Sequence, residues 1–195
     1  NANANIDDNS CEFAEQYYNC DGTCLNDVDQ NNIFYLVDNK VFELHKKLFQ
    51  LNKNTLLIKS TEDSKSIKNV SLLIEKILQL GGNKKSYIIG IGGGIVCDIT
   101  GFIASIFMRG IRFAYVPTTV LSITDAALGG KNGVNFNHIK NLVGTINEPN
   151  FVLVDLCFLE SLKENEFNDG FAEIIKHGCI ASPKLFKKLE KSNIS

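Results

Sequence analysis

A run of three glycines between two apolar segments constrains the fold of this chain most strongly. Tyr87–Ile91 is apolar and has the length of a buried strand, Gly92–Gly94 follow it, and Ile95–Met108 has the pattern of a buried helix. Because glycine has no Cβ, such a turn lets the backbone approach a phosphate group, which the N–H groups and dipole of the helix then hold. A tight packing turn explains the run equally well. The spacing is not G-x-G-x-x-G, since Ile95 stands at the place of the last glycine.

Strand-like and helix-like segments alternate through the rest of the chain. Further strands are predicted at Asn32–Val37, Thr55–Lys59, Arg112–Val116 and Phe151–Asp155. Helical spacing joins Val41, Leu44, Leu48 and Leu51, then Val70, Leu72, Leu73, Ile77 and Leu80, and it returns in Glu164–Ile180 and from Pro183 onward. The strands are apolar throughout rather than alternating. This pattern predicts an α/β fold, a parallel sheet wrapped by helices, with the beginning of a helical domain at the C-terminal end.

Composition argues against a nucleic-acid-binding protein and a membrane-spanning protein, and it distinguishes residues 1–30 from the rest of the chain. The formal net charge of −2 argues against a general nucleic-acid binder, and no apolar run reaches the length of a membrane span. Residues 1–30 carry seven acidic side chains, no Lys or Arg, and the cysteines Cys11, Cys20 and Cys24. We expect a separate acidic leader there, either disordered or similar to the calcium-binding, Cys- and Asp-bearing repeats of secreted bacterial proteins. No signal peptide is recognisable. The other cysteines, Cys97, Cys157 and Cys179, are expected to be buried thiols.

Polar residues cluster after the strand Arg112–Val116. Pro117-Thr118-Thr119 is followed by Asp125, by Gly129-Gly130-Lys131 and by Lys140-Asn141. Threonines at the carboxyl end of a strand lie where ligands bind in open α/β sheets, so these residues predict a pocket for an anionic polyol. A solvated loop with scattered charges is the alternative. Asp98, early in an apolar helix, is expected to cap that helix or to bind a ligand.

A third polar group lies in Gly170–Gly178. On a helix, Glu173 shares one face with Lys176 and His177, which suits either a metal or a pair of charges. The chain has only three histidines, His45, His138 and His177, which are too few and too scattered to predict a three-histidine metal site.

Six motifs in series resemble those of the 3-dehydroquinate synthase family, within the sugar-phosphate cyclases, from about Ile33 to Glu190. They are Gly92-Gly93-Gly94-Ile95-Val96-Cys97-Asp98, Met108-Arg109-Gly110, Val116-Pro117-Thr118-Thr119, Gly129-Gly130-Lys131, Lys140-Asn141-Leu142 and Ala172-Glu173-Ile174-Ile175-Lys176. The resemblance implies a Rossmann-like NAD-binding domain at 31–162 and the start of a metal- and substrate-binding helical domain at 163–195, with 1–30 outside the enzyme fold.

The resemblance also implies a role for each matching residue. It implies cofactor binding by Asp38, Glu62, Lys65, Gly93, Gly94, Asp98, Thr118, Thr119, Lys140, Phe158 and Ser161. It implies catalysis or substrate binding by Arg109, Asp125, Lys131, Asn141 and Lys176, and metal binding by Glu173. The implied cofactors are NAD and Zn²⁺ or Co²⁺, and the two remaining metal ligands are expected beyond Ser195.

The implied activity is that of a phosphate-eliminating lyase of the shikimate pathway, which leads to chorismate and the aromatic amino acids. Such an enzyme converts 3-deoxy-D-arabino-heptulosonate 7-phosphate to 3-dehydroquinate. We expect a cytoplasmic protein that forms a homodimer at full length and contacts no nucleic acid or membrane. The 195-residue chain alone is expected to bind NAD weakly and to catalyse no turnover. The alternatives are a 2-deoxy-scyllo-inosose or valiolone cyclase, a glycerol dehydrogenase relative, and an extracellular calcium-binding module.

Overall fold

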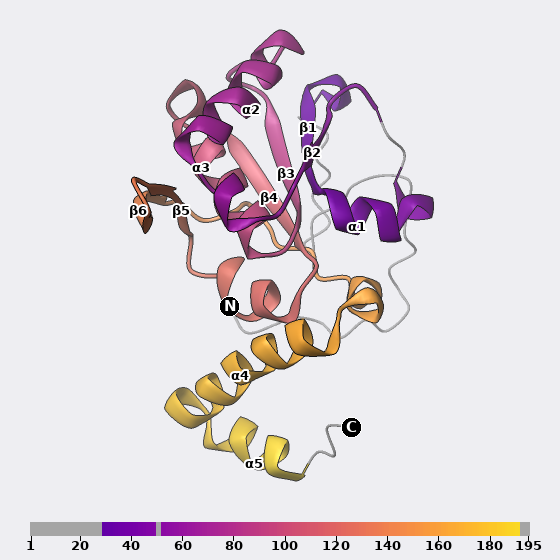
Figure 1. Cartoon of the computed structure of the whole chain (residues 1–195), viewed down its shortest axis with the longest axis vertical. Coiled ribbons are helices and arrows are strands. Elements are labelled where there is room, and N and C mark those ends of the chain that lie inside the picture. Colours follow the sequence, from indigo (N-terminus) through magenta and orange to yellow (C-terminus); the bar gives the residue numbers. More distant parts are fainter. Residues whose placement is uncertain (1–28, 50–51, 192–195) are drawn as a thin grey trace.

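The computed structural model describes residues 29–49 and 52–191, and it has a four-stranded parallel sheet at its centre. The strands lie in the order β2-β1-β3-β4 (Figure 1). Their bounds are Ile33–Asp38 for β1, Thr55–Ile58 for β2, Tyr87–Gly92 for β3 and Arg112–Pro117 for β4. The predicted α/β class with a parallel sheet is confirmed.

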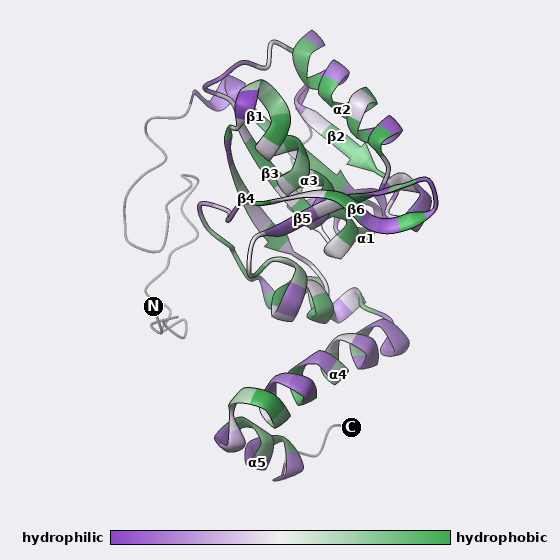
Figure 2. Cartoon of the chain, turned by 90° about the vertical axis from the view of Figure 1, so that its left-hand side faces the viewer, coloured by the Kyte–Doolittle hydropathy of each residue, from purple (hydrophilic) through white to green (hydrophobic). Residues whose placement is uncertain are grey.

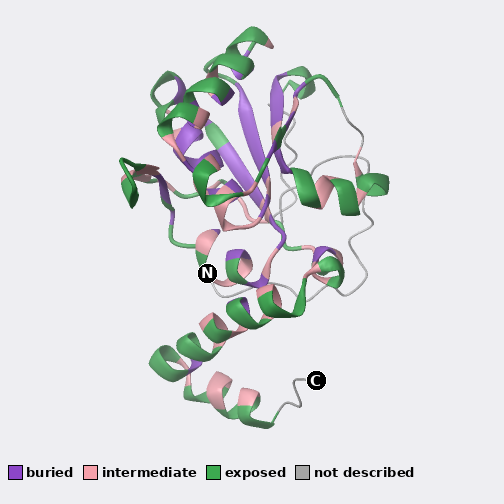
Figure 3. Cartoon of the chain, viewed as in Figure 1, coloured by how far each residue is buried: buried purple, intermediate pink, exposed green. Residues whose placement is uncertain are grey.

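The core lies mainly on one face of this sheet, under helices α2 (Ile67–Gln79) and α3 (Gly94–Ile106). Apolar side chains of both helices pack there against Phe34, Leu36 and Ile88, none of which is exposed. A smaller cluster on the opposite face includes Ile89 and Ala114. Figure 3 shows the buried strands as the continuous interior of the molecule. Burial on both faces explains why the strands are apolar throughout.

Three expectations about individual elements were wrong. The leucine spacing after β1 forms only the short helix α1 (Asn39–Leu44) and a separate 3₁₀ turn, and Leu44 and Leu48 are 63% and 59% exposed. Leu72, expected on the inner face of α2, is 50% exposed. The segment Phe151–Asp155 forms only a single bridge to β4, between Tyr115 and Val152, with hydrogen bonds from the Tyr115 amide to Phe151 and from the Leu153 amide to Tyr115.

A hairpin that the sequence analysis did not predict packs against α3. It consists of the antiparallel strands β5 (Lys131–Phe136) and β6 (Ile139–Ile146), with a register shift between Val134 and Phe136. Its sequence is rich in Gly and Asn, which are depleted in strands, and its turn contains two left-handed residues, Asn137 and His138. Local propensity therefore predicts loop, and the packing of β5 on α3 forms the strand instead.

Two helices follow the sheet, as predicted. They are α4 (Glu164–Ala181) and α5 (Pro183–Lys191), and Figure 1 shows them extending away from the sheet. Gly170 of α4 lies so close to Leu121 that an added Cβ would come within 2.4 Å of the Leu121 backbone nitrogen. Figure 2 shows hydrophilic residues along much of both helices. Within residues 29–49 and 52–191, no helix is long and apolar enough to cross a membrane. The predictions made for Cys11, Cys20 and Cys24 fall outside the described residues.

Candidate functional site

The carboxyl ends of three neighbouring strands meet at one edge of the sheet. Strand β1 pairs with β3, and β3 pairs with β4, so that Asp38, Gly92 and Thr118 follow or end adjacent strands. From β1 the chain continues to β2 on one side, while β3 lies on the other. In open parallel sheets, ligands bind in the crevice at such a switch in strand order.

The glycine run Gly92–Gly94 allows close packing at this edge and leaves the first amides of α3 accessible. A Cβ on Gly92 would lie 2.6 Å from Cγ2 of Val96 and 3.1 Å from Cβ of Asp38, so only glycine fits there. Gly93 stands at the N-cap of α3, where no side chain caps the helix, and Gly94 is the first helical residue. The first N–H groups of a helix have no carbonyl partner within it. The start of α3 therefore offers uncapped amides next to the buried carboxylate of Asp38, which also accepts a hydrogen bond from the Lys40 amide (2.7 Å).

The two threonines after β4 differ in what their hydroxyl groups do. Thr119 and Ser122 cap each other across the next turn, with their hydroxyl oxygens 2.9 Å apart. Thr118 is only 2% exposed, and its hydroxyl has no hydrogen-bond partner. The Thr118 amide donates to the carbonyl of Gly92 (3.0 Å), which places this threonine beside the glycine run. A buried hydroxyl without a partner is costly, so Thr118 is suited to a ligand at this edge.

Lys65 is buried at the centre of a polar contact between α3 and the hairpin. Its ammonium group forms an ion pair with Asp98 and donates to Oδ1 of Asn141 (2.5 Å). Burial raises the pKa of Asp98, and the Lys65 ammonium opposes this rise. Asp98 thus does not cap α3, contrary to one of the two roles expected for it.

Glu62, expected to act together with Lys65, faces the hairpin instead. Its Oε1 accepts a hydrogen bond from Nδ2 of Asn135 (2.8 Å) and lies 3.7 Å from Nζ of Lys140. The bond from Asn135 is the main cause that lowers the pKa of Glu62. Glu62, Lys65 and Lys140 therefore hold the hairpin against the segment that follows β2.

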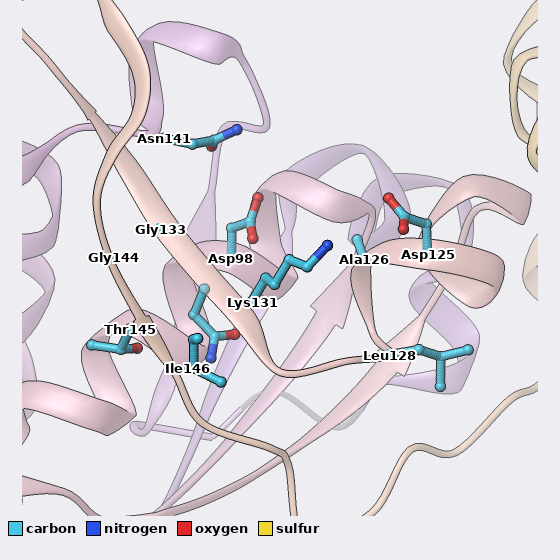
Figure 4. A pocket seen from close by; sticks show the side chains of 11 residues that line it. Asp98, Asp125, Ala126, Leu128, Lys131, Gly133, Asn141, Gly144, Thr145 and Ile146 are labelled. Carbon is cyan, nitrogen blue, oxygen red and sulfur yellow. The ribbon is translucent and has the colours of Figure 1, made fainter.

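A cavity of about 510 Å³ opens between α3, the turn after β4 and the hairpin. Figure 4 shows Lys131 extending between Asp98 and Asp125, with Asn141 on the far side of Asp98. The remaining lining residues include Ala126, Leu128 and Ile146, which the sequence analysis did not single out. The exposed ammonium group of Lys131 can pair with an anionic group of a ligand, whereas the two carboxylates and the amide can form hydrogen bonds with its hydroxyl groups. The structure therefore brings Asp98, Asp125, Lys131 and Asn141 together.

Arg109, Phe158 and Ser161 are among the predicted site residues that do not line this cavity. Arg109 follows α3 and precedes β4, so it lies at the amino edge of the sheet, and its backbone is left-handed (φ 63°). Phe158 is buried edge-on against the ring of His45, with centroids 5.0 Å apart. The hydroxyl of Ser161 lies 2.7 Å from Nε2 of the same histidine.

Glu173 and Lys176 form an ion pair on α4, one helical turn apart. The hydrogen bond with Glu173 is the main cause that raises the pKa of Lys176, and the charge of Asp125 acts in the same direction. Among residues 29–49 and 52–191, no group of three His, Cys, Asp or Glu side chains could hold a metal ion. A metal site is therefore not formed by the described residues.

The cysteine prediction holds at one position of the three. Cys97 is buried on α3, but Cys157 is half-buried and Cys179 is exposed on α4. Burial raises the pKa of the Cys157 thiol to about 11.

Sequence reasoning missed the asparagines that hold the hairpin in place. Asn132 is 4% exposed, accepts a hydrogen bond from the Tyr115 hydroxyl (2.6 Å) and donates to the carbonyl groups of Gly130 and Asn147. Asn135 accepts from the amide of Asn141 (3.0 Å). The only sequence signal was the asparagine content of 131–147, which is equally typical of a loop.

Comparison with known proteins gives one consistent result. A family model described as 3-dehydroquinate synthase N-terminal matches residues 55–169. A 3-dehydroquinate synthase from Dictyoglomus thermophilum is 39% identical over 163 residues, which are 83% of this chain and 46% of that protein. The chain spans about half the length of the curated relatives it matches.

Solved structures of two related enzymes share the fold. A 2-epi-5-epi-valiolone synthase from Streptomyces hygroscopicus with bound NAD⁺ and Zn²⁺ has a TM-score of 0.75 and 27% identity, over 85% of this chain and 48% of that one. A 2-deoxy-scyllo-inosose synthase complexed with carbaglucose-6-phosphate, NAD⁺ and Co²⁺ has a TM-score of 0.66 and 30% identity, over 74% of this chain and 42% of that one.

Proposed function

Because the chain belongs to the 3-dehydroquinate synthase family, we propose that it is the NAD-binding half of an enzyme that makes 3-dehydroquinate from 3-deoxy-D-arabino-heptulosonate 7-phosphate. The single observation that carries the proposal is that the uncapped start of α3 and the polar cavity open at the same edge of the sheet. A cofactor held at one of them would place its reactive ring near a substrate in the other. The closer sequence match to 3-dehydroquinate synthases favours this substrate over those of the two related cyclases.

The residues at the glycine run suit NAD. The amides of Gly93, Gly94 and Ile95 would hold the pyrophosphate, which has the charge that a helix N-terminus favours. Asp38, at the end of β1, would accept hydrogen bonds from a ribose on the adenosine side. The unpartnered hydroxyl of Thr118 would bind the nicotinamide half. When bound, NAD⁺ would take a hydride from the carbon that bears a substrate hydroxyl, while that hydroxyl loses its proton, and would later return the hydride, so no net oxidation occurs.

The cavity residues would bind and orient the sugar phosphate. Lys131 is exposed at its mouth, where its ammonium group can pair with a phosphate or carboxylate. Asn141 offers its amide N–H₂ group, because Oδ1 is already bonded to Lys65. Asp125 lies near enough to Lys176 to raise the pKa of that lysine, so these two can share the hydrogen bonds of a polyol. Binding by several such groups fixes the geometry in which phosphate leaves.

The described residues do not form a metal site by themselves. Glu173 remains the proposed ligand of this chain on the basis of the family resemblance. Its present partner is Lys176, so metal binding would have to displace that ammonium group. Arg109 is not part of the proposed site of the same chain, since it lies at the opposite edge of the sheet.

Isothermal titration calorimetry of the chain with NAD⁺ tests the cofactor proposal. We expect weak binding, and a loss of about tenfold in affinity for Thr118→Val, which removes one buried hydrogen bond. Thr55→Val is the matched control, because Thr55 begins β2 at the opposite edge and should leave the affinity unchanged. Absence of any heat at millimolar NAD⁺ from the folded chain would contradict the proposal. Release of phosphate from the heptulosonate by this chain alone would contradict its assignment as one half of the enzyme.

A further inference from the structure

The Lys131 side chain takes its direction from the backbone. Figure 4 shows it extending between Asp98 and Asp125, but within the described part of the chain its ammonium group forms no hydrogen bond or ion pair. Gly129 (φ 78°) and Gly130 (φ 64°), both left-handed, come directly before it. Because glycine is the most permissive residue, the direction of Lys131 depends on what fixes the peptide bond between Gly130 and Lys131.

The side-chain amide of Asn132 fixes this peptide bond. Its Nδ2 donates to the carbonyl groups of Gly130 (2.9 Å) and Asn147 (2.8 Å). The Gly130 carbonyl belongs to the peptide bond before Lys131, and it also accepts from the Asn147 amide (2.8 Å). One side chain therefore joins the start of β5 to the end of β6 directly beside Lys131.

The end of β6 is held on α3 at the same place. Nδ2 of Asn147 donates to Oγ of Ser105 (3.1 Å), and the hydroxyl of Thr145 donates to the same oxygen (2.9 Å). The Ser105 hydroxyl donates in turn to the carbonyl of Gly101, one helical turn earlier (2.6 Å). The Asn147 carbonyl that Asn132 binds is thus part of a fixed end of the hairpin.

Tyr115 ties Asn132 to the central sheet. This tyrosine of β4 is 1% exposed, and its hydroxyl donates to Oδ1 of Asn132 (2.6 Å). Because the oxygen of the amide accepts from Tyr115, the N–H₂ group of the amide faces the two carbonyls. A Cβ on Gly101 would overlap both Oδ1 of Asn132 and the Tyr115 hydroxyl, so this glycine leaves room for the contact. The orientation of the amide is therefore set in the core of the protein.

We propose that Asn132 is a positioning residue for Lys131, and that it directs the Lys131 ammonium group toward the anionic group of a ligand in the cavity. Asn132 also lines this cavity, but its oxygen and both of its N–H groups are bonded within the protein, so it acts through Lys131. Neighbouring side chains of a strand point to opposite faces, so the buried Asn132 leaves Lys131 facing outward. The inference rests on the proposed function, in which Lys131 pairs with a phosphate or carboxylate.

Titration of the full 195-residue chain with inorganic phosphate, followed by NMR at the amides of residues 129–133, tests this role. We expect Lys131→Met to raise the dissociation constant about tenfold, and Asn132→Leu to raise it by a similar factor. Tyr115→Phe removes only the hydroxyl group and should raise the constant about threefold, because the amide loses one of its three hydrogen bonds. If Asn132→Leu does not fold, Tyr115→Phe carries the same test.

A double variant distinguishes positioning from a general structural role. Asn132→Leu combined with Lys131→Met should bind phosphate no more weakly than Lys131→Met alone, because a positioning effect disappears with the group that is positioned. A residue that only stabilises the cavity would weaken binding further in the double variant.

Asn54→Leu is the matched control. Asn54 is 2% exposed, and its Nδ2 likewise donates to two backbone carbonyls, those of Asn31 (2.8 Å) and Ile33 (3.1 Å). It comes just before β2, at the opposite edge of the sheet, so phosphate binding should stay unchanged although the fold is destabilised. Equal weakening by Asn54→Leu and Asn132→Leu would overturn the proposal.

The results separate this inference from the proposed function. If Lys131→Met leaves phosphate binding unchanged, the cavity does not bind anions through Lys131, and both are wrong. If Lys131→Met weakens binding but Asn132→Leu and Tyr115→Phe do not, the proposed function stands and the positioning role is overturned. The same holds if the losses caused by Lys131→Met and Asn132→Leu add up in the double variant.

Discussion

The parallel sheet and the β5–β6 hairpin contrast in how they are held. Strands β1 and β3 lie between packed layers, with Phe34, Leu36 and Ile88 completely buried. The hairpin keeps only its inner face against α3, and its outer end is fixed by hydrogen bonds and ion pairs of Glu62, Lys65 and Asn135. The cofactor end of the proposed site is therefore built on apolar packing, and the substrate end on polar contacts.

This difference indicates which part of the site can adjust. Close packing resists change, because each displaced side chain leaves a void or a clash. Polar contacts at a partly exposed edge exchange with water and ligand groups at low cost. We expect ligands to alter the position of the hairpin more than that of the glycine run.

The largest expected effect is a loss of stability when a phenylalanine of the sheet, rather than one of the hairpin, is replaced by alanine. Phe34→Ala should lower the free energy of unfolding by about 3–5 kcal/mol, because it leaves a cavity in the core. Phe136→Ala, on the hairpin, should cost about 1 kcal/mol or less, because Phe136 is 44% exposed. Urea unfolding followed by circular dichroism measures both. Equal costs would mean that hairpin and sheet are packed alike.

Removing the buried lysine between the regions should have a smaller, pH-dependent effect. Lys65→Met should cost about 2–3 kcal/mol at pH 7, because Asp98 loses its partner. Burial already raises the pKa of Asp98 in the folded protein, so stability falls as the pH rises through that pKa. Without Lys65 this pKa rises further, and the cost should be larger at pH 8 than at pH 5.

Lys84→Met is the control for this pH dependence. The Lys84 ammonium group donates to backbone carbonyls, including that of Met108 (3.1 Å), and not to an acid. Its cost should therefore be the same at both pH values. A cost of Lys65→Met that does not change with pH would mean that Asp98 is not the group it stabilises.

The smallest effect is expected at the outer end of the hairpin. Glu62→Gln should cost less than about 0.5 kcal/mol at pH 7, since Glu62 is exposed and its ion pair is screened by solvent. The pKa of Glu62 is lowered in the folded protein, so its contribution is present above its unfolded pKa, about 4.3. That contribution disappears as the pH falls through the folded pKa. Hydrogen exchange of the hairpin amides, at pH 7, should quicken while that of β3 does not.

Sequence patterns were sufficient to predict the strands of the sheet, because the apolar runs and glycines that indicate them are local features of the sequence. A continuous apolar run such as Tyr87–Ile91 must be buried on both sides, and three glycines before an apolar helix leave few backbone arrangements. The same reasoning failed where a segment depends on its neighbours. Leu44 and Leu48 have helical spacing but are exposed, so they cover no part of the core. In the hairpin, glycines and asparagines interrupt the residues that favour strands, so the local signal is weak.

The amino-acid sequence by itself determined the α/β class, the positions of the four main strands along the chain and the family, since these follow from periodicity and from motifs read in series. Only the tertiary structure decided that Lys65 contacts Asp98 and Asn141, that Arg109 lies at the other edge of the sheet, and that β6 pairs with no strand but β5 in the described part of the chain. The contact between Lys65 and Asn141, for example, joins residues that are 76 positions apart in the sequence. Their geometry depends on how helices and hairpin pack on the sheet, and no local pattern carries that information.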